Sequence, residues 1–229
     1  MAGPKLSAAE MAERRQAMLH AAFQLFSERN IDSVTLSDVA AESGYPLRTV
    51  QRYFHVKENL VDETATWAFE GFMDRYRIQK RDLSKTTGAE DFEFFLDSFL
   101  ALYRDEADLL RFNQFFNIYV RAEHIGADQL HSYGGMIGVV RERFRALCRK
   151  GQQDGTLRTD IPADEMFSIT LHLMLAAVTR YAVGLVYDVG VDPERELLIL
   201  RDMLLERYTV STEPCGEALK RAVEPGDMR

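Results

Sequence analysis

Side chains suited to binding a polyanion are concentrated in one short segment, residues 43–60, which reads SGYPLRTVQRYFHVKENL. Between Gly44 and Lys57 this segment carries Arg48 and Arg52 but no carboxylate, although the whole chain has a formal charge of −8. Guanidinium groups pair with phosphates and with the edge of guanine, and a glutamine amide pairs with adenine in the same way. The segment therefore predicts contact with a nucleic acid. The alternative is that both arginines are only solvated charges on a helix.

The charge of the chain is unevenly distributed. Residues 1–60 contain equal numbers of acidic and basic side chains, so the whole −8 belongs to residues 61–229. A chain of 229 residues with 46% apolar content can bury a substantial core and can hold more than one domain. A neutral first unit joined to an acidic body predicts two tasks on one chain.

Residue patterns for catalysis and for metal binding are missing from the sequence. The five histidines and two cysteines show no HExxH or CxxC spacing, no glycine-rich loop follows a strand, and no nucleophile elbow is present. Cys148 and Cys215 lie far apart, as expected of free thiols in a reducing compartment. The first residues contain no apolar run of signal-peptide length. We therefore expect a cytoplasmic protein that is not an enzyme and that uses neither metal nor cofactor.

Helix-start and helix-stop signals place the basic segment on the last of three short elements. Ser7 and Glu10 form a capping-box pattern that opens a helix ending near Glu28. Thr35 opens a second helix of about two turns, to Glu42, and a glycine turn follows at Gly44. Pro46 suits the first position of a third helix. Two short helices joined by a tight turn that contains glycine predict a helix-turn-helix, whose second helix enters the DNA major groove.

Residues 35–60, TLSDVAAESGYPLRTVQRYFHVKENL, resemble the signature of the TetR family of transcriptional regulators. The preceding AAFQLFSERNIDSVT is similar to the first helix and connection of that family. The matching positions are Thr35, Val39, Ala40, Gly44, Thr49, Tyr53, Phe54, Lys57, Glu58 and Leu60. The resemblance implies an all-α protein, with a three-helix DNA-binding domain at residues 1–57 and a ligand-sensing and dimerisation domain at 58–209. Residues 210–229 are polar with two prolines, so we expect a loose tail.

The resemblance also implies which residues contact DNA. The positions that carry over are Ser37, Leu47, Arg48, Thr49, Gln51, Arg52, Tyr53 and Lys57. Thr49, Tyr53 and Lys57 would anchor phosphates, with Ser37 as an additional candidate, and the other four would read bases. The family more often has a hydroxyl cap at Pro46, a small residue at Arg48 and tyrosine at Gln51. Because of these departures the operator sequence does not follow from the resemblance.

The acidic body reads as helices throughout. The helices are expected from Lys57 to about Leu83, then over 90–103, 105–124, 129–153, 163–187 and 193–208, with no strand-like alternation. Two of them carry broad aromatic stripes. These stripes are either core or the wall of a ligand cavity, since bundles place ligand sites between helices. The candidate ligand-binding residues are Phe95, Phe99, Phe112, Phe115, Phe116, Tyr119, His172 and Met174.

The segment 167–187 is apolar on nearly all sides. Its length would span a membrane, but His172, Arg180 and several hydroxyls interrupt it, so a buried helix in an oligomer is the preferred interpretation. We expect residues 163–187 and 193–208 to pair across a two-fold axis as a four-helix bundle. The alternative is that 163–187 is only a central core helix.

Together these features predict a homodimeric DNA-binding regulator, most simply a repressor released by a small molecule. Two recognition helices would read a palindrome whose half-sites lie about 34 Å apart, or a multiple of that distance. A ligand would act by shifting the helix that follows Leu60, with a coupling of about 1–3 kcal/mol. The alternatives are control by a protein partner, activation instead of repression, and an enzyme or pure interaction module that retains the motif.

Overall fold

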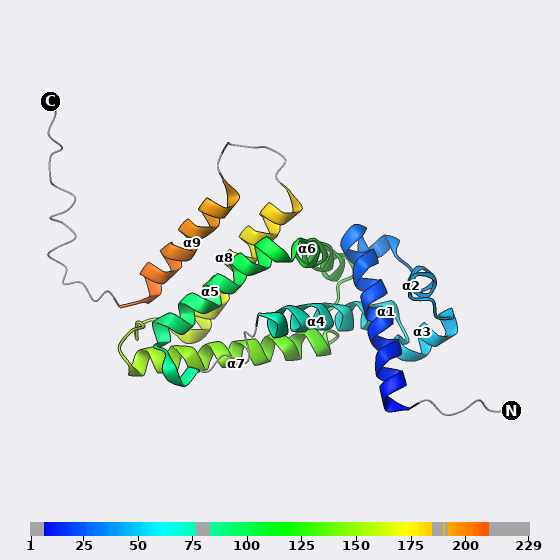
Figure 1. Ribbon diagram of the computed structural model, residues 1–229, viewed down its shortest axis with the longest axis horizontal. Coiled ribbons are helices and arrows are strands. Elements are labelled where there is room, and N and C mark those ends of the chain that lie inside the picture. Colours follow the sequence, from blue (N-terminus) through cyan, green and yellow to red (C-terminus); the bar gives the residue numbers. More distant parts are fainter. Residues whose placement is uncertain (1–6, 77–82, 185–189, 191, 211–229) are drawn as a thin grey trace, which may run out of the picture.

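The computed structural model describes residues 7–76, 83–184, 190 and 192–210 (Figure 1). Within these residues the chain forms nine α-helices, two single turns of 3-10 helix, and one isolated bridge between Leu157 and Thr209. The all-α prediction is therefore confirmed. In chain order the elements are α1 (Ala8–Glu28), η1 (Ile31–Ser33), α2 (Leu36–Ser43), α3 (Leu47–Phe54), α4 (Lys57–Arg75), η2 (Leu83–Lys85), α5 (Gly88–Asp105), α6 (Ala107–Ala122), α7 (His131–Gln153), α8 (Ala163–Val183) and α9 (Pro193–Tyr208).

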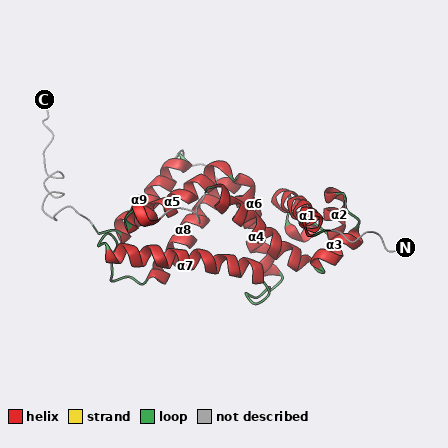
Figure 2. Cartoon of the chain, turned by 60° about the horizontal axis from the view of Figure 1, so that its bottom comes forward, coloured by secondary structure: helices red, strands yellow, loops and turns green. Residues whose placement is uncertain are grey.

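Helices α1 to α3 form a compact unit at one end of the molecule, and α9 lies at the other end (Figures 1 and 2). Both predicted capping boxes are present, at Ser7 for α1 and at Thr35 for α2. The unit is held by fully buried side chains from each element, among them Phe26, Val50 and Phe54. These contacts fix the short helices, which would not be stable alone.

Helix α4 connects this unit to the body and packs against both. Its first turns bury Leu60, Val61 and Ala65, and the helix contacts α1. Its last turns bury Phe72, and the helix also contacts α7. The proposed domain boundary after residue 57 therefore falls at the start of a helix whose contacts belong to both units.

The body is a bundle in which α5, α7 and α8 pack on one another, with α6 against α8 and against α1 (Figure 2). Helix α9 lies on α5 and α8. Three fully or nearly fully buried rings join the central helices. The ring of Phe144 lies 5.9 Å from that of Phe92 and 5.4 Å from that of Phe167, centroid to centroid. This core holds the helices that flank the cavity described below.

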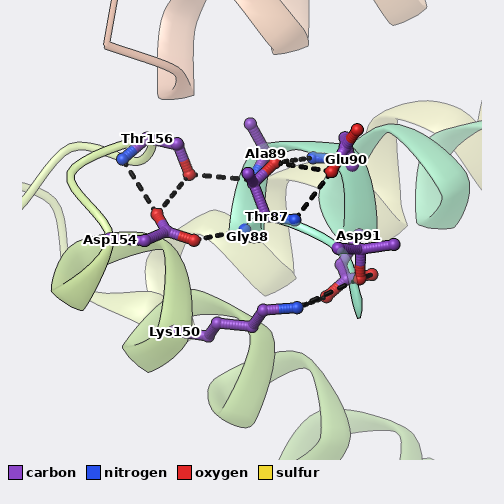
Figure 3. Close-up of polar contacts among 9 residues, drawn as sticks. Thr87, Gly88, Ala89, Glu90, Asp91, Lys150, Asp154 and Thr156 are labelled. Carbon is purple, nitrogen blue, oxygen red and sulfur yellow. Dashed lines mark hydrogen bonds and ion pairs between the residues drawn. The ribbon is translucent and has the colours of Figure 1, made fainter. Parts of the chain in front are cut away.

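The start of α5 is fastened to the end of α7 (Figure 3). The backbone N–H of Gly88 donates to Asp154 Oδ2 at 2.8 Å, and that of Ala89 donates to Thr156 Oγ1 at 3.0 Å. The Gly88 backbone lies so close to α7 that an added Cβ would stand 2.1 Å from the Cα of Gly151. Orphan N–H groups at a helix start need such acceptors, and here the neighbouring chain segment supplies them.

Several predicted boundaries differ from the structure by a few residues. Helix α4 ends at Arg75, where the N–H of Tyr76 bonds to the backbone oxygens of Phe72 and Asp74, and the predicted extension to about Leu83 lies on residues outside those described. Helix α8 ends at Val183, since Gly184 has a φ of 104° that cannot continue a helix. Helix α7 starts two residues later than expected, and Pro46 is the N-cap of α3, not its first residue. The expected tail lies, apart from Val210, outside the described residues.

Candidate DNA-binding surface and effector cavity

The turn before α3 depends on two residues with restricted or unusual backbone preferences. Gly44 ends α2 in the left-handed conformation, with φ 73° and ψ 12°. Glycine adopts that region without the penalty that a Cβ brings. Two residues later Pro46, with φ −59°, sets the entry angle of α3. The turn is short enough to hold α3 rigidly across α2.

Helix α3 has one buried and one exposed face. Val50 and Phe54 are fully buried and attach the helix to its neighbours. The exposed residues are Leu47, Arg48, Gln51 and Arg52. These are the four predicted base readers, and the structure brings all of them to one outer surface.

The two arginines of α3 are not neutralised by the protein. Neither Arg48 nor Arg52 forms an ion pair with a described residue, and the Arg52 guanidinium lies 5.9 Å from the ring centre of Tyr53. Most other arginines of the body are paired, for example Arg145 with Asp164 at 2.5 Å. Unpaired guanidinium groups on an exposed recognition-type helix are available to phosphates and base edges.

The predicted phosphate anchors are placed less uniformly. Ser37 is exposed and Thr49 is half-buried beside the α3 surface. The Tyr53 hydroxyl is buried and has no hydrogen-bond partner among the described residues. Lys57 donates to the backbone oxygen of Asp32 at 3.2 Å.

Lys57 also reaches the body of the protein. Its Nζ lies 5.2 Å from the ring centre of Tyr119 on α6. Burial lowers the pKa of Lys57, although nearby carboxylates, Asp32 first among them, oppose this shift. In this conformation Lys57 joins the first unit to α6 and does not lie on the outer face of α3.

Two adjoining cavities occupy the body. The smaller, about 70 Å³, is enclosed almost wholly by apolar side chains from α4, α5, α7 and α8. The larger, about 520 Å³, lies between α6, α7 and α8 and has polar groups on its wall. The smaller is lined by Phe69, Phe72, Met73, Phe95, Ser98, Phe99, Leu102, Tyr133, Met136, Ile137, Val140, Leu171 and Leu175. The larger is lined by Asn113, Gln114, Asn117, Tyr133, Ile137, Leu171, His172, Leu175, Ala176, Thr179, Arg180 and Val183.

Three of the eight predicted ligand residues line these cavities. Phe95 and Phe99 belong to the apolar one and His172 to the polar one. The other five are absent from both walls: Phe112, Phe115, Phe116, Tyr119 and Met174. Phe112 instead packs between the first unit and the body. Its ring centre lies 5.7 Å from that of Phe23 and 6.4 Å from that of Phe26, both on α1.

A polar pair in the larger cavity was missed by the sequence analysis. The amide of Asn113 donates from Nδ2 to Thr179 Oγ1 at 3.1 Å, and both side chains are buried. The Asn113 Oδ1 has no hydrogen-bond partner among the described residues. The available signal was a polar residue on an otherwise apolar helix face, but these two residues are 66 positions apart and nothing in the sequence joins them.

A buried acid links α4 to the start of α7. Asp62 is buried and accepts from the backbone N–H groups of Ser132 and Tyr133, each at 2.9 Å. A carboxylate at a helix N-terminus is stabilised by the free N–H groups and the helix dipole. Tyr133 also lines both cavities, so the cavity wall and α4 are joined through one residue.

The outer faces of α8 and α9 remain apolar. Leu173 is 39% exposed and Met203 is 58% exposed, and Ile169, Val183, Leu198 and Ile199 extend the same surfaces. Among the described residues α8 is the one helix long and apolar enough to cross a membrane, and it packs against four other helices here. Its inner face is thus used by the fold, whereas its outer face is left uncovered by the described residues of one protomer.

Groups suited to metal or thiol chemistry are not assembled in the described part of the chain. No cluster of three or more His, Cys, Asp or Glu side chains could hold a metal ion there. Cys148 is buried, and burial raises the pKa of its thiol to about 12, so the reactive thiolate is suppressed.

Known proteins resemble this chain in both sequence and structure. Residues 18–64 match the family model described as bacterial regulatory proteins, tetR family. The HTH-type transcriptional repressor KstR2 of Rhodococcus jostii is 24% identical over 200 residues, covering 83% of this chain and 91% of the relative. The structure of KstR2 from Mycobacterium tuberculosis aligns with a TM-score of 0.58 and 18% identity, over 92% of this chain and 99% of the other.

A second solved structure is that of the regulator FadR from Bacillus subtilis in complex with stearoyl-CoA. It aligns with a TM-score of 0.64 and 15% identity, over 83% of this chain and 97% of the other. TetR family regulators are DNA-binding transcription factors and not enzymes, which confirms the prediction that this chain is no enzyme. The helix-turn-helix at residues 36–54 lies within the segment that matches the tetR family model, and together these findings support a TetR family regulator.

Proposed function

We propose that this protein is a cytoplasmic homodimeric repressor that leaves a palindromic operator when a small molecule occupies the cavities between α5, α6, α7 and α8. The observation that carries the proposal is the outer face of α3, the second helix of a helix-turn-helix. Leu47, Arg48, Gln51 and Arg52 are exposed there, and the two arginines form no ion pair with described residues. The KstR2 relatives are named repressors, and the FadR neighbour was solved with stearoyl-CoA, which supports both halves of the proposal.

The proposed DNA contacts are of two kinds: contacts to phosphates, which position the protein, and contacts to base edges, which recognise the sequence. Arg48 and Arg52 are one helical turn apart, so both can reach the same groove, where arginine pairs with guanine. Gln51 is suited to adenine and Leu47 to the methyl group of thymine. Ser37 and Thr49 flank this surface and would anchor phosphates. Tyr53 and Lys57 would join them only after a rearrangement that frees the Tyr53 hydroxyl and releases Lys57 from Asp32.

The dimer proposal rests on the uncovered apolar faces of α8 and α9. Exposed apolar surface of this kind marks a protein interface when it is contiguous. Leu173→Glu combined with Met203→Glu should convert a dimer to a monomer in light scattering. Val139→Glu is the control, because Val139 is 54% exposed and belongs to α7, a helix outside the proposed interface. A monomeric wild type, or a dimer that survives the double change, would overturn the interface.

Helix α4 would transmit the effect of ligand binding from the cavities to α3 and so release the DNA. Tyr133 lines the cavities, and its backbone N–H is held by Asp62 of α4. Only two residues separate the end of α3 from the start of α4, so a shift of α4 must move α3. A ligand that displaces the Tyr133 ring would pull on Asp62 and change the angle between the two recognition helices of a dimer. The ligand acts only to the extent that it prefers the displaced arrangement.

Asp62→Asn tests that route. An amide presents only one acceptor oxygen, so one of the two α7 N–H groups loses its partner and the unfolding free energy should fall by about 1–3 kcal/mol. A compound found by thermal-shift screening, which releases DNA from the wild type, should release it much less from the variant. Glu70→Gln removes an exposed acid from the same helix and is the matched control. Equal release from all three proteins would exclude Asp62 from the route.

The transcriptional role is tested on the DNA that flanks the protein's own gene. In transcription reactions with purified RNA polymerase, wild-type protein should lower the transcript from that promoter. The Arg48→Ala, Arg52→Ala double variant should leave it unchanged, as should omission of the protein. A rise in transcript would identify an activator. No effect at any promoter bound by the protein would contradict a direct regulatory role.

A further inference from the structure

The two cavities differ in chemistry but share part of their wall. Tyr133, Ile137, Leu171 and Leu175 border both. On one side of this shared wall the lining is almost entirely aliphatic and aromatic. On the other side Asn113, with Thr179, adds hydrogen-bonding groups. A molecule that fills both would be apolar at one end and polar at the other.

The polar end contains a hydrogen-bonding group that the protein does not satisfy. Asn113 is only 3% exposed, and no residue in the described part of the chain bonds to its Oδ1. Its Nδ2 is occupied by Thr179 Oγ1 at 3.1 Å. Buried polar atoms in native proteins nearly always have a partner, so an unsatisfied one on a cavity wall points to a bound molecule.

The pair requires a partner that both donates and accepts. When Asn113 Nδ2 donates to Thr179, the Asn113 oxygen remains as an acceptor and the Thr179 hydroxyl proton remains as a donor. If the amide is turned by 180°, Thr179 donates to Asn113, and two amide N–H groups and a hydroxyl lone pair remain. At least one donor and one acceptor are therefore left in either orientation. A hydroxyl group matches them, because it donates one hydrogen bond and accepts another.

We propose that the cavities bind an amphipathic molecule with a hydroxyl group at its polar end, hydrogen-bonded to Asn113 and Thr179, and an apolar body against Phe95 and Phe99. This inference deepens the proposed function, on which it rests, by assigning the ligand chemistry of the effector site. Arg180 and His172 also border the larger cavity, but both are exposed and keep their hydration. Asn113 and Thr179 are desolvated, so they discriminate more strongly between ligands.

The test uses two probes of equal size, octan-1-ol and 1-methoxyheptane. Both have nine heavy atoms, but the ether accepts a hydrogen bond and cannot donate one. Calorimetric titration of the full-length wild type should show octan-1-ol binding about tenfold more tightly than the ether, which corresponds to one buried hydrogen bond.

Two variants should remove this preference. Asn113→Leu and Thr179→Val each delete one half of the pair with little change in volume, so both probes should bind with similar affinity. Thr170→Val is the control, because Thr170 is a fully buried threonine of α8 whose hydroxyl also has no partner but which lies outside both walls. Its preference should equal that of the wild type. Thermal unfolding of each variant establishes that it is folded, and either cavity variant alone suffices.

Several results would overturn the inference. Equal affinities of the wild type for alcohol and ether, binding of neither probe, or a preference that survives in both cavity variants would each do so. A different experimental result would show that the proposed function fails. If octan-1-ol is preferred as expected but DNA affinity does not change with its concentration, the polar recognition stands and ligand release fails.

Discussion

Helices α5 and α6 carry aromatic side chains at similar spacing but use them differently. The α5 rings of Phe95 and Phe99 border the apolar cavity, with their ring centres 5.4 Å apart in an edge-to-face pair. The α6 ring of Phe112 is fully buried against α1, the first helix of the DNA-binding unit. One stripe therefore forms part of the wall of the apolar cavity, and the other forms the contact between the first unit and the body.

This difference shows what a periodic pattern can and cannot specify. Both stripes predict a helix with a broad buried face, and both helices are present. The pattern does not say whether the buried face meets a neighbouring helix completely or leaves a gap. That outcome depends on which helix lies opposite, α1 for α6 and α7 for α5, and hence on the tertiary arrangement.

The largest expected effect is that of Phe112→Ala. Removing a fully buried ring between α1 and α6 should lower the unfolding free energy by about 4 kcal/mol in urea denaturation. Affinity for octan-1-ol should change little, because Phe112 lines neither cavity. A loss below about 1 kcal/mol would mean that α1 and α6 are not tightly packed in solution.

Phe99→Ala is the corresponding substitution on α5. Its ring already borders empty space, so fewer contacts are lost, and we expect a cost of about 3 kcal/mol. Unlike Phe112→Ala, this change should alter the affinity for octan-1-ol, measured by calorimetry. If both substitutions changed the affinity for octan-1-ol equally, Phe99 and Phe112 would not differ in their relation to the cavity.

A smaller effect is expected where α5 is fastened to α7 (Figure 3). Gly88→Ala would force the new methyl group against the Gly151 backbone, and we expect a loss of about 2 kcal/mol. The matched control is Gly134→Ala on α7, where a Cβ would meet nothing within 4 Å. That change should stabilise the helix by about 0.5 kcal/mol, as expected of alanine in place of glycine. Thermal unfolding of both variants distinguishes a steric contact from a general effect of glycine replacement.

The local elements of the fold were largely predictable from sequence. The caps at Ser7 and Thr35, the glycine turn at Gly44 and the proline-led helix after it are short-range signals, and all are present. The end of α4 was not predictable, since helical periodicity continues past Tyr76 while the backbone tightens there.

The lining of the proposed effector cavities was only partly predictable. Phe95, Phe99 and His172, which belong to that lining, are large or polar residues in helices of the body. Asn113 and Thr179 meet through tertiary packing across 66 residues, and Asp62 meets Tyr133 across 71. Contacts of that range leave no periodic trace in a single sequence. The outer face of α3 was predictable because all its residues belong to one short helix.

The most direct test of the central claim is a fluorescence-polarisation titration of the protein against labelled DNA from the flanks of its own gene. Excess scrambled duplex is present as competitor, and the titration is repeated at several salt concentrations. The wild type should bind saturably, and its affinity should fall as salt rises. Arg149→Ala, on the exposed surface of α7, should match it.

The Arg48→Ala, Arg52→Ala double variant should bind at least tenfold more weakly, because each lost base or phosphate contact contributes about 1 kcal/mol or more. Its affinity should also depend less steeply on salt. If the double variant binds that DNA as tightly as the wild type, with the same salt dependence, α3 is not the recognition helix and the account is wrong.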